Sequence, residues 1–192
     1  MAELVTAELV TAEAATPPTD HAIYVALLFY RFDSRGNREI FVRYNPDEEP
    51  ITEYSIPIGN SEGTEDLEAC AKVCASTFLE LDPARMEFKH LSHADVTNVG
   101  RKFWVRIFLL EANSEVEAVA QQKYFHGWKY AFILLSSLET VSIYDNINVA
   151  RGAIEYFFKS TVPSATEPTN TTAKREPWYR KSILRRLSIH KK

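Results

Sequence analysis

The 192-residue sequence has only two cysteines, six glycines and no long apolar run. Two cysteines cannot build a disulfide scaffold, so we expect the reducing interior of a cell, either the nucleus or the cytoplasm. Every apolar run is shorter than the roughly 18–20 residues that cross a bilayer, which predicts no transmembrane segment. The first residues also lack the basic and apolar regions of a secretory signal. The low glycine content excludes a collagen-like chain.

The residues that are present favour one folded domain with charged ends. Hydrophobic residues make up 45% and aromatic residues 12% of the chain, which is enough for a single core. The net charge of −4 is unevenly distributed, because residues 174–192 contain eight basic residues and one acid, a charge of +7. The preceding residues therefore carry −11. An acidic body argues against general nucleic-acid binding by the body itself.

Four segments follow from composition and periodicity. Residues 1–20 repeat the pattern Ala-Glu-Leu-Val-Thr with a period of five, which fits neither a helix nor a strand, so we expect a flexible arm. Residues 21–160 hold the apolar segments of the domain. Residues 161–172 are rich in Pro, Thr and Ser and predict a linker, and residues 173–192 form the basic tail.

The apolar patterns predict a mixed α/β (α+β) sandwich. Residues 23–30 predict a strand buried on both faces, and a turn at residues 33–37 leads to a returning strand at residues 39–44. We expect a helix that Thr64 caps and Asp82-Pro83 ends, and a final helix that Asn146 caps. The remaining expected elements are short strands at 54–58, 86–91, 102–110 and within 123–135, and a helix or loop at 111–122.

The stretch from Gly59 to Leu81 resembles the conserved box of the Nudix hydrolases. That box reads Gly, five residues, Glu, seven residues, Arg-Glu, an aliphatic residue, any residue, Glu-Glu, any residue, Gly and an aliphatic residue. Gly59 and Glu65 occupy its first two fixed positions, and Ala75 and Leu81 its aliphatic positions. The resemblance implies a Nudix-like α/β/α sandwich with a mixed sheet over residues 21–160.

The charged positions of the box are occupied by other residues here. Val73 and Cys74 stand in place of Arg-Glu, and Thr77 and Phe78 in place of Glu-Glu. In the family these carboxylates gather divalent cations, usually Mg²⁺, which prefer anionic oxygen ligands. The resemblance therefore implies a domain that has lost hydrolysis and needs no cofactor or metal. The alternative is a divergent Mg²⁺-dependent hydrolase of nucleoside diphosphate compounds or RNA caps, with Glu62 and Glu65 as relocated ligands.

Two smaller clusters have simpler interpretations than metal sites. Cys70 and Cys74 are four residues apart on the expected helix, where two thiols without further ligands predict buried free cysteines rather than zinc binding. His90 and His93, followed by Asp95, are expected in an exposed polar loop, with transition-metal binding as the alternative.

The aromatic residues between 104 and 132 have two competing interpretations. Dense aromatic segments usually form core. Some of these rings could instead stack a base in a cleft, and the candidates are Trp104, Tyr124, Phe125 and Trp128.

The tail predicts a basic amphipathic helix that begins at Pro177. Its apolar stripe consists of Tyr179, Ile183, Leu184 and Leu187, flanked by Arg180, Lys181, Arg185 and Arg186. Such a helix suits an acidic partner, phosphate, an anionic membrane or nuclear import, and it could also fold back onto the acidic body. Ser188 follows two arginines and is a candidate phosphorylation site.

These observations favour a catalytically inactive binding or scaffolding module in a protein or ribonucleoprotein complex. We expect a protein partner, with RNA or a nucleotide as a further ligand. A nucleic-acid or membrane binder driven by the tail is the remaining alternative, and the sequence leaves a homodimer open.

Overall fold

The computed structural model describes residues 16–48, 51, 53–61, 65–98, 100–122, 124–144 and 147–161, together with the backbone of residues 5–7. The tail beyond residue 161 and residues 62–64 lie outside the described residues. The predictions for Glu62, the linker and the tail therefore stay predictions. The helix caps predicted at Thr64 and Asn146 are wrong, because the first helix begins at Leu67 with Asp66 as its cap and the final helix begins at Arg151.

Strand β2 (Ala22–Phe32) forms the centre of the molecule. Its residues 25–30 are all buried, as the apolar run predicts, because both faces of the strand are covered. A turn with Gly36 at φ 79° leads into β3 (Arg38–Tyr44), which pairs antiparallel with the end of β2. The predicted hairpin is confirmed.

The main sheet has six strands in the order β5–β6–β2–β3–β7, with β4 paired to the first half of β2. β6 runs parallel to β2, whereas β5, β4 and β3 pair antiparallel with their neighbours, so the sheet is mixed. The remaining strands of this sheet are β4 (Ile58–Asn60), β5 (Lys89–Asn98), β6 (Arg101–Glu111) and β7 (Lys129–Leu134).

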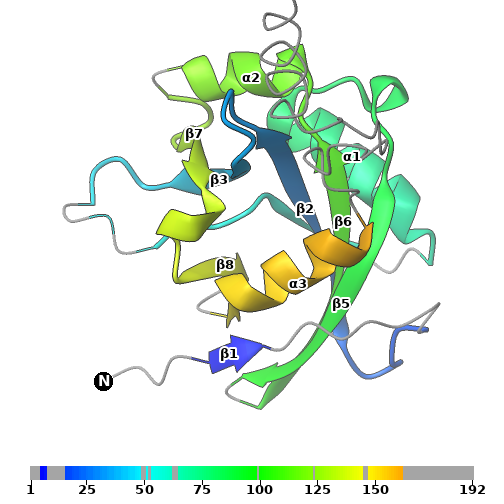
Figure 1. Cartoon of the computed structure of the whole chain (residues 1–192). Helices are drawn as coiled ribbons and strands as arrows, with labels where there is room; N and C mark the ends of the chain where they lie inside the picture. Colours follow the sequence, from blue (N-terminus) through cyan, green and yellow to red (C-terminus); the bar gives the residue numbers. More distant parts are fainter. Residues whose placement is uncertain are drawn as a thin grey trace, which may run out of the picture.

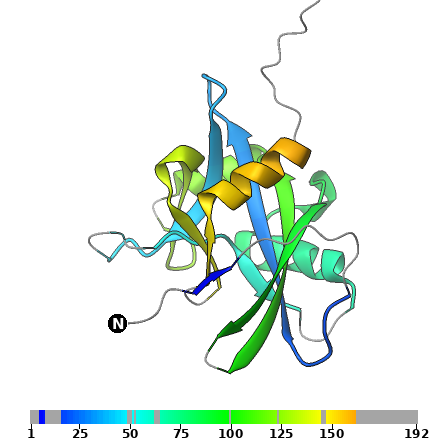
Figure 2. The ribbon, with the colours of Figure 1, turned by 60° about the horizontal axis from the view of Figure 1, so that its bottom comes forward.

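A second, smaller sheet has the order β1–β9–β8, and it comprises β1 (Val5–Ala7), β8 (Thr140–Tyr144) and β9 (Ile147–Ala150). β1 lies inside the segment expected to be an arm and pairs in parallel with β9, at the edge of this sheet (Figure 2). Ser55 joins the two sheets, because it bridges to Arg43 of β3 on one side and to Ser142 of β8 on the other.

The sheet separates two cores, and helices cover both faces (Figure 1). On one face α3 (Arg151–Thr161) packs with β8 and β9, and Phe157 and Phe158 belong to this core. On the other face α1 (Leu67–Leu79) and α2 (Ser114–Gln121) cover the second core. The predicted α/β/α sandwich is confirmed. Short 3₁₀ turns occur at Pro83–Arg85 and Leu135–Ser137, and no helix in the described ranges has the length and apolar character to cross a membrane.

The start of the final helix was predicted wrongly. Residues 147–150 form β9, and the helix begins at Arg151. Ile147 and Val149 are buried in the strand, where β-branched side chains pack well. The apolar spacing of Ile147 and Ala150 fits a helix equally well, so periodicity could not separate the two structures.

The segment from His90 to Asp95 was also predicted wrongly. His90 and His93 lie in β5, not in an exposed loop. His93 is buried, and its ring stacks on Trp104 of β6 at 5.2 Å and an interplanar angle of 20°. The long pairing of β5 with β6 overrides the weak strand propensity of this segment.

Candidate functional site

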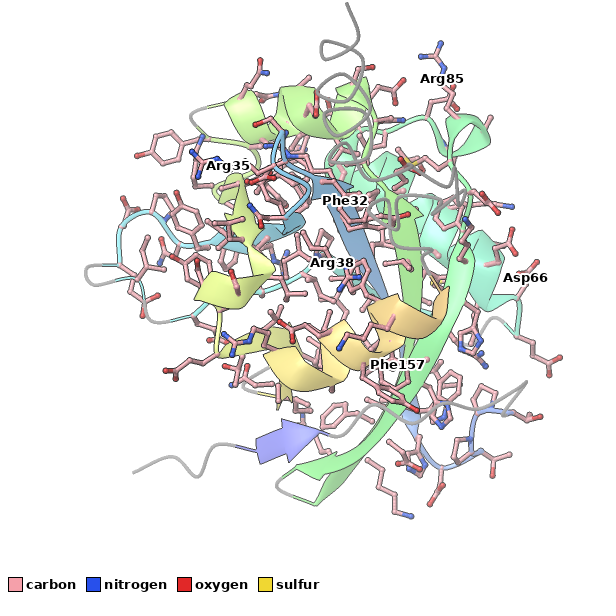
Figure 3. All side chains as sticks on the ribbon, in the orientation of Figure 1. Phe32, Arg35, Arg38, Asp66, Arg85 and Phe157 are labelled. Carbon is pink, nitrogen blue, oxygen red and sulfur yellow. The ribbon has the colours of Figure 1, made fainter. Side chains whose placement is uncertain are left out.

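The candidate site is built from α1 and β4. Asp66 caps α1, since its side chain accepts a hydrogen bond from the backbone N–H of Ala69 at 2.9 Å. Figure 3 shows Asp66 where the chain enters α1, at the outer edge of the molecule. Of the nearby acids only Glu68 lies in the first turn, because the helix begins at Leu67. The helix ends at Leu79, because the next residue, Glu80, adopts the left-handed backbone conformation. The predicted end at Asp82 lies three residues later.

The inner face of α1 contacts β4 directly. A β-carbon on Gly59 would lie 3.1 Å from Cys74 Sγ and 3.2 Å from Cys74 Cβ, which is closer than ordinary van der Waals contact, so a side chain here would require Cys74 to shift. Both cysteines are buried and free, as predicted. Burial, and then the nearby Cys70 thiol, raise the pKa of Cys74 to about 12, so Cys74 is a neutral thiol at neutral pH. The Cys70 thiol donates to the carbonyl of Asn60 at 3.4 Å.

The outer face of α1 exposes hydrocarbon side chains. Val73 is 60% and Phe78 52% exposed, and Thr77 lies between them on the surface. Phe78 therefore does not belong to the buried face of α1. The buried stripe instead runs through Leu67, Cys70, Ala71, Cys74, Ala75 and Leu79.

These residues surround a hollow of about 550 Å³ between α1 and β4. Its described lining contains no carboxylate and comprises Gly59, Asn60, Ser61, Ala69, Cys70, Val73, Cys74, Thr77 and Phe78. A divalent cation such as Mg²⁺ needs several anionic oxygens, and this lining offers hydrocarbon, hydroxyl, amide and neutral thiol groups. The donor set does not fit a magnesium ion. Across the described residues no three His, Cys, Asp or Glu side chains are grouped to hold a metal.

The acids near α1 have other positions. Glu65 is exposed and precedes the cap, Asp66 bonds the helix backbone, and Glu68 pairs with Lys72 at 2.6 Å. None of the three lines the hollow. Glu62, the other proposed relocated ligand, lies outside the described residues.

A second concavity of about 450 Å³ lies between β3, β8 and the chain leading into β7. Arg43 lines it and holds its guanidinium 4.8 Å from the ring centre of Trp128, while Arg43 Nε donates to Ser55 Oγ at 3.1 Å. Two acids, Glu48 and Glu53, also line this cleft. Ile58 lines this cleft and the next residue, Gly59, lines the α1 hollow, so the two concavities are neighbours. No sequence motif indicates Arg43, which lies within β3.

The Nudix hydrolase RenU from M. smegmatis matches 82% of this chain and 98% of its own length, with a TM-score of 0.53 and 13% sequence identity. The chain has the Nudix fold. An Ap4A hydrolase from C. elegans matches 61% of this chain and 83% of its own length, with a TM-score of 0.44 and 16% identity. A mutT/nudix family protein from Listeria innocua matches 74% and 93%, with a TM-score of 0.48 and 11% identity.

No family model matches the sequence, and the comparison with curated proteins also finds no match. The Nudix fold is therefore established by structure alone. Sequence identities of 11–16% show the fold and leave the chemistry of the box residues open.

Of the four base-stacking candidates on this Nudix fold, two lie in the core. Trp104 is 1% exposed and stacks on His93, and Phe125 is buried against Tyr130, so neither can meet a base. These two assignments are wrong, because the sheet buries both rings. Tyr124 and Trp128 are exposed, and Trp128 lines the cleft with Arg43.

Proposed function

We propose that this chain is a Nudix-fold binding module without hydrolase activity, which contacts a protein partner through the surface of α1. The observation that carries the proposal is the outer face of α1, where Val73, Thr77 and Phe78 surround a hollow whose described lining has no carboxylate. Exposed apolar groups around a concavity favour an apolar ligand. They do not favour a polyphosphate with its metal ions.

The neutral thiol at position 74 supports the same proposal. A thiol whose pKa is raised to about 12 by burial neither binds Mg²⁺ nor acts as a base at neutral pH. The module would serve in a protein complex, or in one that also contains RNA. The cysteine content and the basic tail favour a nuclear or cytoplasmic location.

A turnover assay tests the proposal. Purified full-length chain is incubated with nucleoside diphosphate compounds, dinucleoside polyphosphates or capped RNA, with Mg²⁺ or Mn²⁺. We expect no metal-dependent product above the background of a matched Glu65→Gln sample prepared in the same way. Metal-dependent turnover above roughly 0.1 s⁻¹, well below ordinary enzyme rates, would overturn the proposal.

The same assay addresses the divergent hydrolase. If the acids near α1 serve as relocated metal ligands, the wild-type chain would hydrolyse a substrate, and Glu62→Gln or Glu65→Gln would abolish hydrolysis without changing the free energy of unfolding. A contaminating hydrolase would act equally in all three samples.

The Arg43–Trp128 cleft supports a second candidate function, which is nucleotide or RNA binding without hydrolysis. An exposed indole and a guanidinium held over it can stack on a base, and stacking of this kind contributes about 1–3 kcal/mol per base. Glu48 and Glu53 in the same cleft disfavour phosphate, so the cleft suits the base more than the phosphates.

A further inference from the structure

The hollow at α1 has the properties of a groove for an amphipathic helix. Val73 and Phe78 protrude at 60% and 52% exposure beside an apolar concavity of about 550 Å³. Helices that bind in grooves insert apolar residues spaced three or four positions apart. A helix that binds here needs apolar residues that fit the hollow and charges that complement its surroundings.

The ends of the groove are acidic. Glu65, Asp66 and Glu68 lie at the start of α1, and Glu80 lies at its end. Lys72 offsets part of this charge through its contact with Glu68 at 2.6 Å, and His126 Nε2 lies 3.3 Å from Glu80. Residues 1–173 as a whole carry −11. A ligand with an apolar stripe and basic flanks would therefore fit both the hollow and its surroundings.

The chain contains one segment with this pattern. The apolar residues of the tail recur at helical spacing at positions 179, 183, 184 and 187, and four basic residues flank them. Residues 174–192 carry +7, opposite in sign to the rest of the chain.

The tail is long enough to reach the hollow. Helix α3 ends at Thr161, on the face of the sheet opposite α1, and seventeen residues separate it from Tyr179. That length spans up to roughly 55 Å when extended, enough to pass around a domain with a radius of gyration of about 14 Å. A tether of this kind gives an effective concentration on the order of millimolar, so a weak contact suffices within one chain.

We propose that residues 177–188 dock as a helix into the α1 hollow of their own chain, with the stripe on Val73 and Phe78 and the basic residues toward the acids at the ends of α1. The tail thereby covers the surface that a partner would use. This inference rests on the proposed function, because a hollow used to hold metal ions and a polyphosphate would not take an apolar occupant.

A spin label on the tail of the full-length protein tests this proposal. Ser182→Cys introduces a thiol outside the stripe, while the two native thiols are buried and so react poorly. We expect amide NMR signals of α1 and β4 to lose most of their intensity when the label is oxidised, relative to the reduced label. Signals of α3 should keep theirs.

Three variants of the labelled chain complete the design. Ile183→Asp/Leu187→Asp in the tail and Phe78→Asp on α1 should each restore the α1 signals. Tyr156→Asp is the matched control, because Tyr156 is a 67% exposed aromatic residue on α3, and it should leave the loss of signal unchanged. Retained α1 signals in the labelled parent chain would overturn the proposal.

Mixing experiments separate docking within a chain from docking between chains. A sample of isotope-labelled chain without the spin label, mixed with spin-labelled chain of natural isotope content, should keep its α1 signals. Loss of signal in this mixture would show that a second copy supplies the tail, which contradicts docking within one chain. Because this measurement does not involve turnover, it can contradict docking of the tail while the proposal of a module without hydrolase activity still holds.

Discussion

Gly59 and Cys74 are packed so closely that a β-carbon at residue 59 would lie 3.1 Å from the sulfur of Cys74. The contact joins the edge strand β4 to the middle of α1. The absence of a side chain at residue 59 therefore fixes how closely the helix approaches the sheet, and with it the position of the hollow.

Gly59→Ala should destabilise the protein, because the added methyl group would overpack a buried contact. We expect the free energy of unfolding to fall by about 1–3 kcal/mol. Gly152→Ala is the control, since nothing lies within 4 Å of the β-carbon it would add in α3. There, alanine should raise stability by about 0.5–1 kcal/mol. Urea unfolding of both variants checks the prediction, and equal stabilities would contradict the close packing.

Two adjacent residues of α1 should respond differently to substitution. Phe78→Ser should change the free energy of unfolding by no more than about 0.5 kcal/mol, because Phe78 is 52% exposed. Leu79→Ala should cost about 2–5 kcal/mol, because Leu79 is buried in the core. Chemical denaturation of the pair measures this, and a large loss in Phe78→Ser would mean that Phe78 faces inward.

Nucleotide addition should quench the fluorescence of Trp128 if the cleft binds a base. Titration of AMP into the wild-type chain is compared with Trp128→Phe, in which the quenching should disappear while the signals of the other two tryptophans remain. Tyr124→Phe is the matched control, as Tyr124 is exposed but does not line the cleft. Wild-type fluorescence unchanged by millimolar AMP would remove nucleotide binding as a candidate function.

Phosphorylation of Ser188 should weaken docking of the tail. A phosphate adds about −1.5 to −2 charges and so opposes attraction to the acidic surroundings of α1. Ser188→Glu in the Ser182→Cys labelled chain should recover part of the α1 signal, and more of it at low salt than at high salt. Ser188→Gln is the uncharged control. Equal signals in the two variants would show that charge at residue 188 does not regulate the contact.

The free energy of unfolding should decrease as the pH falls below about 6.5, the ordinary pKa of histidine. Burial, and then the charge of Arg106, lower the pKa of His93 in the folded state, while nearby Asp95 has a smaller opposite effect. The unfolded chain therefore binds more protons between the lowered folded value and 6.5, so stability is fully present above this window and is lost within it.

His93→Phe should keep the stacking on Trp104 and reduce this pH dependence. One histidine changes the slope by at most about 1.4 kcal/mol per pH unit. Urea unfolding of the two proteins between pH 5 and 8 measures the difference. An identical slope in wild type and variant would rule out His93 as its source.

Patterns over long segments predicted the fold better than patterns at element boundaries. The apolar run at residues 23–30 and the turn at Gly36 specify β2 and the hairpin, because both signals are local. The boundary between β9 and α3 could not be predicted, since Ile147 suits either structure. Pairing of β1 with β9 depends on residues far apart in sequence, because Val5 pairs with Ile147.

The candidate site was predictable where its residues share a helix. The spacing from Gly59 to Phe78 placed the box positions, whereas the direction of Phe78 depends on how α1 rotates against β4. Arg43 and Trp128 come from different elements and meet only in the folded chain. No spacing in the sequence indicates such a pair.

The double bridging of Ser55 bears on how the Arg43 cleft would take a ligand. The backbone around Ser55 is hydrogen-bonded to Arg43 on one side, at 2.7 and 2.9 Å, and to Ser142 on the other, at 2.7 and 3.1 Å. These bonds fasten the floor of the cleft to both sheets, so its walls cannot hinge apart without breaking them. A ligand would therefore bind a cleft whose backbone is already in place, with little loss of backbone entropy. Its association rate would be limited by diffusional encounter and not by closure of the cleft.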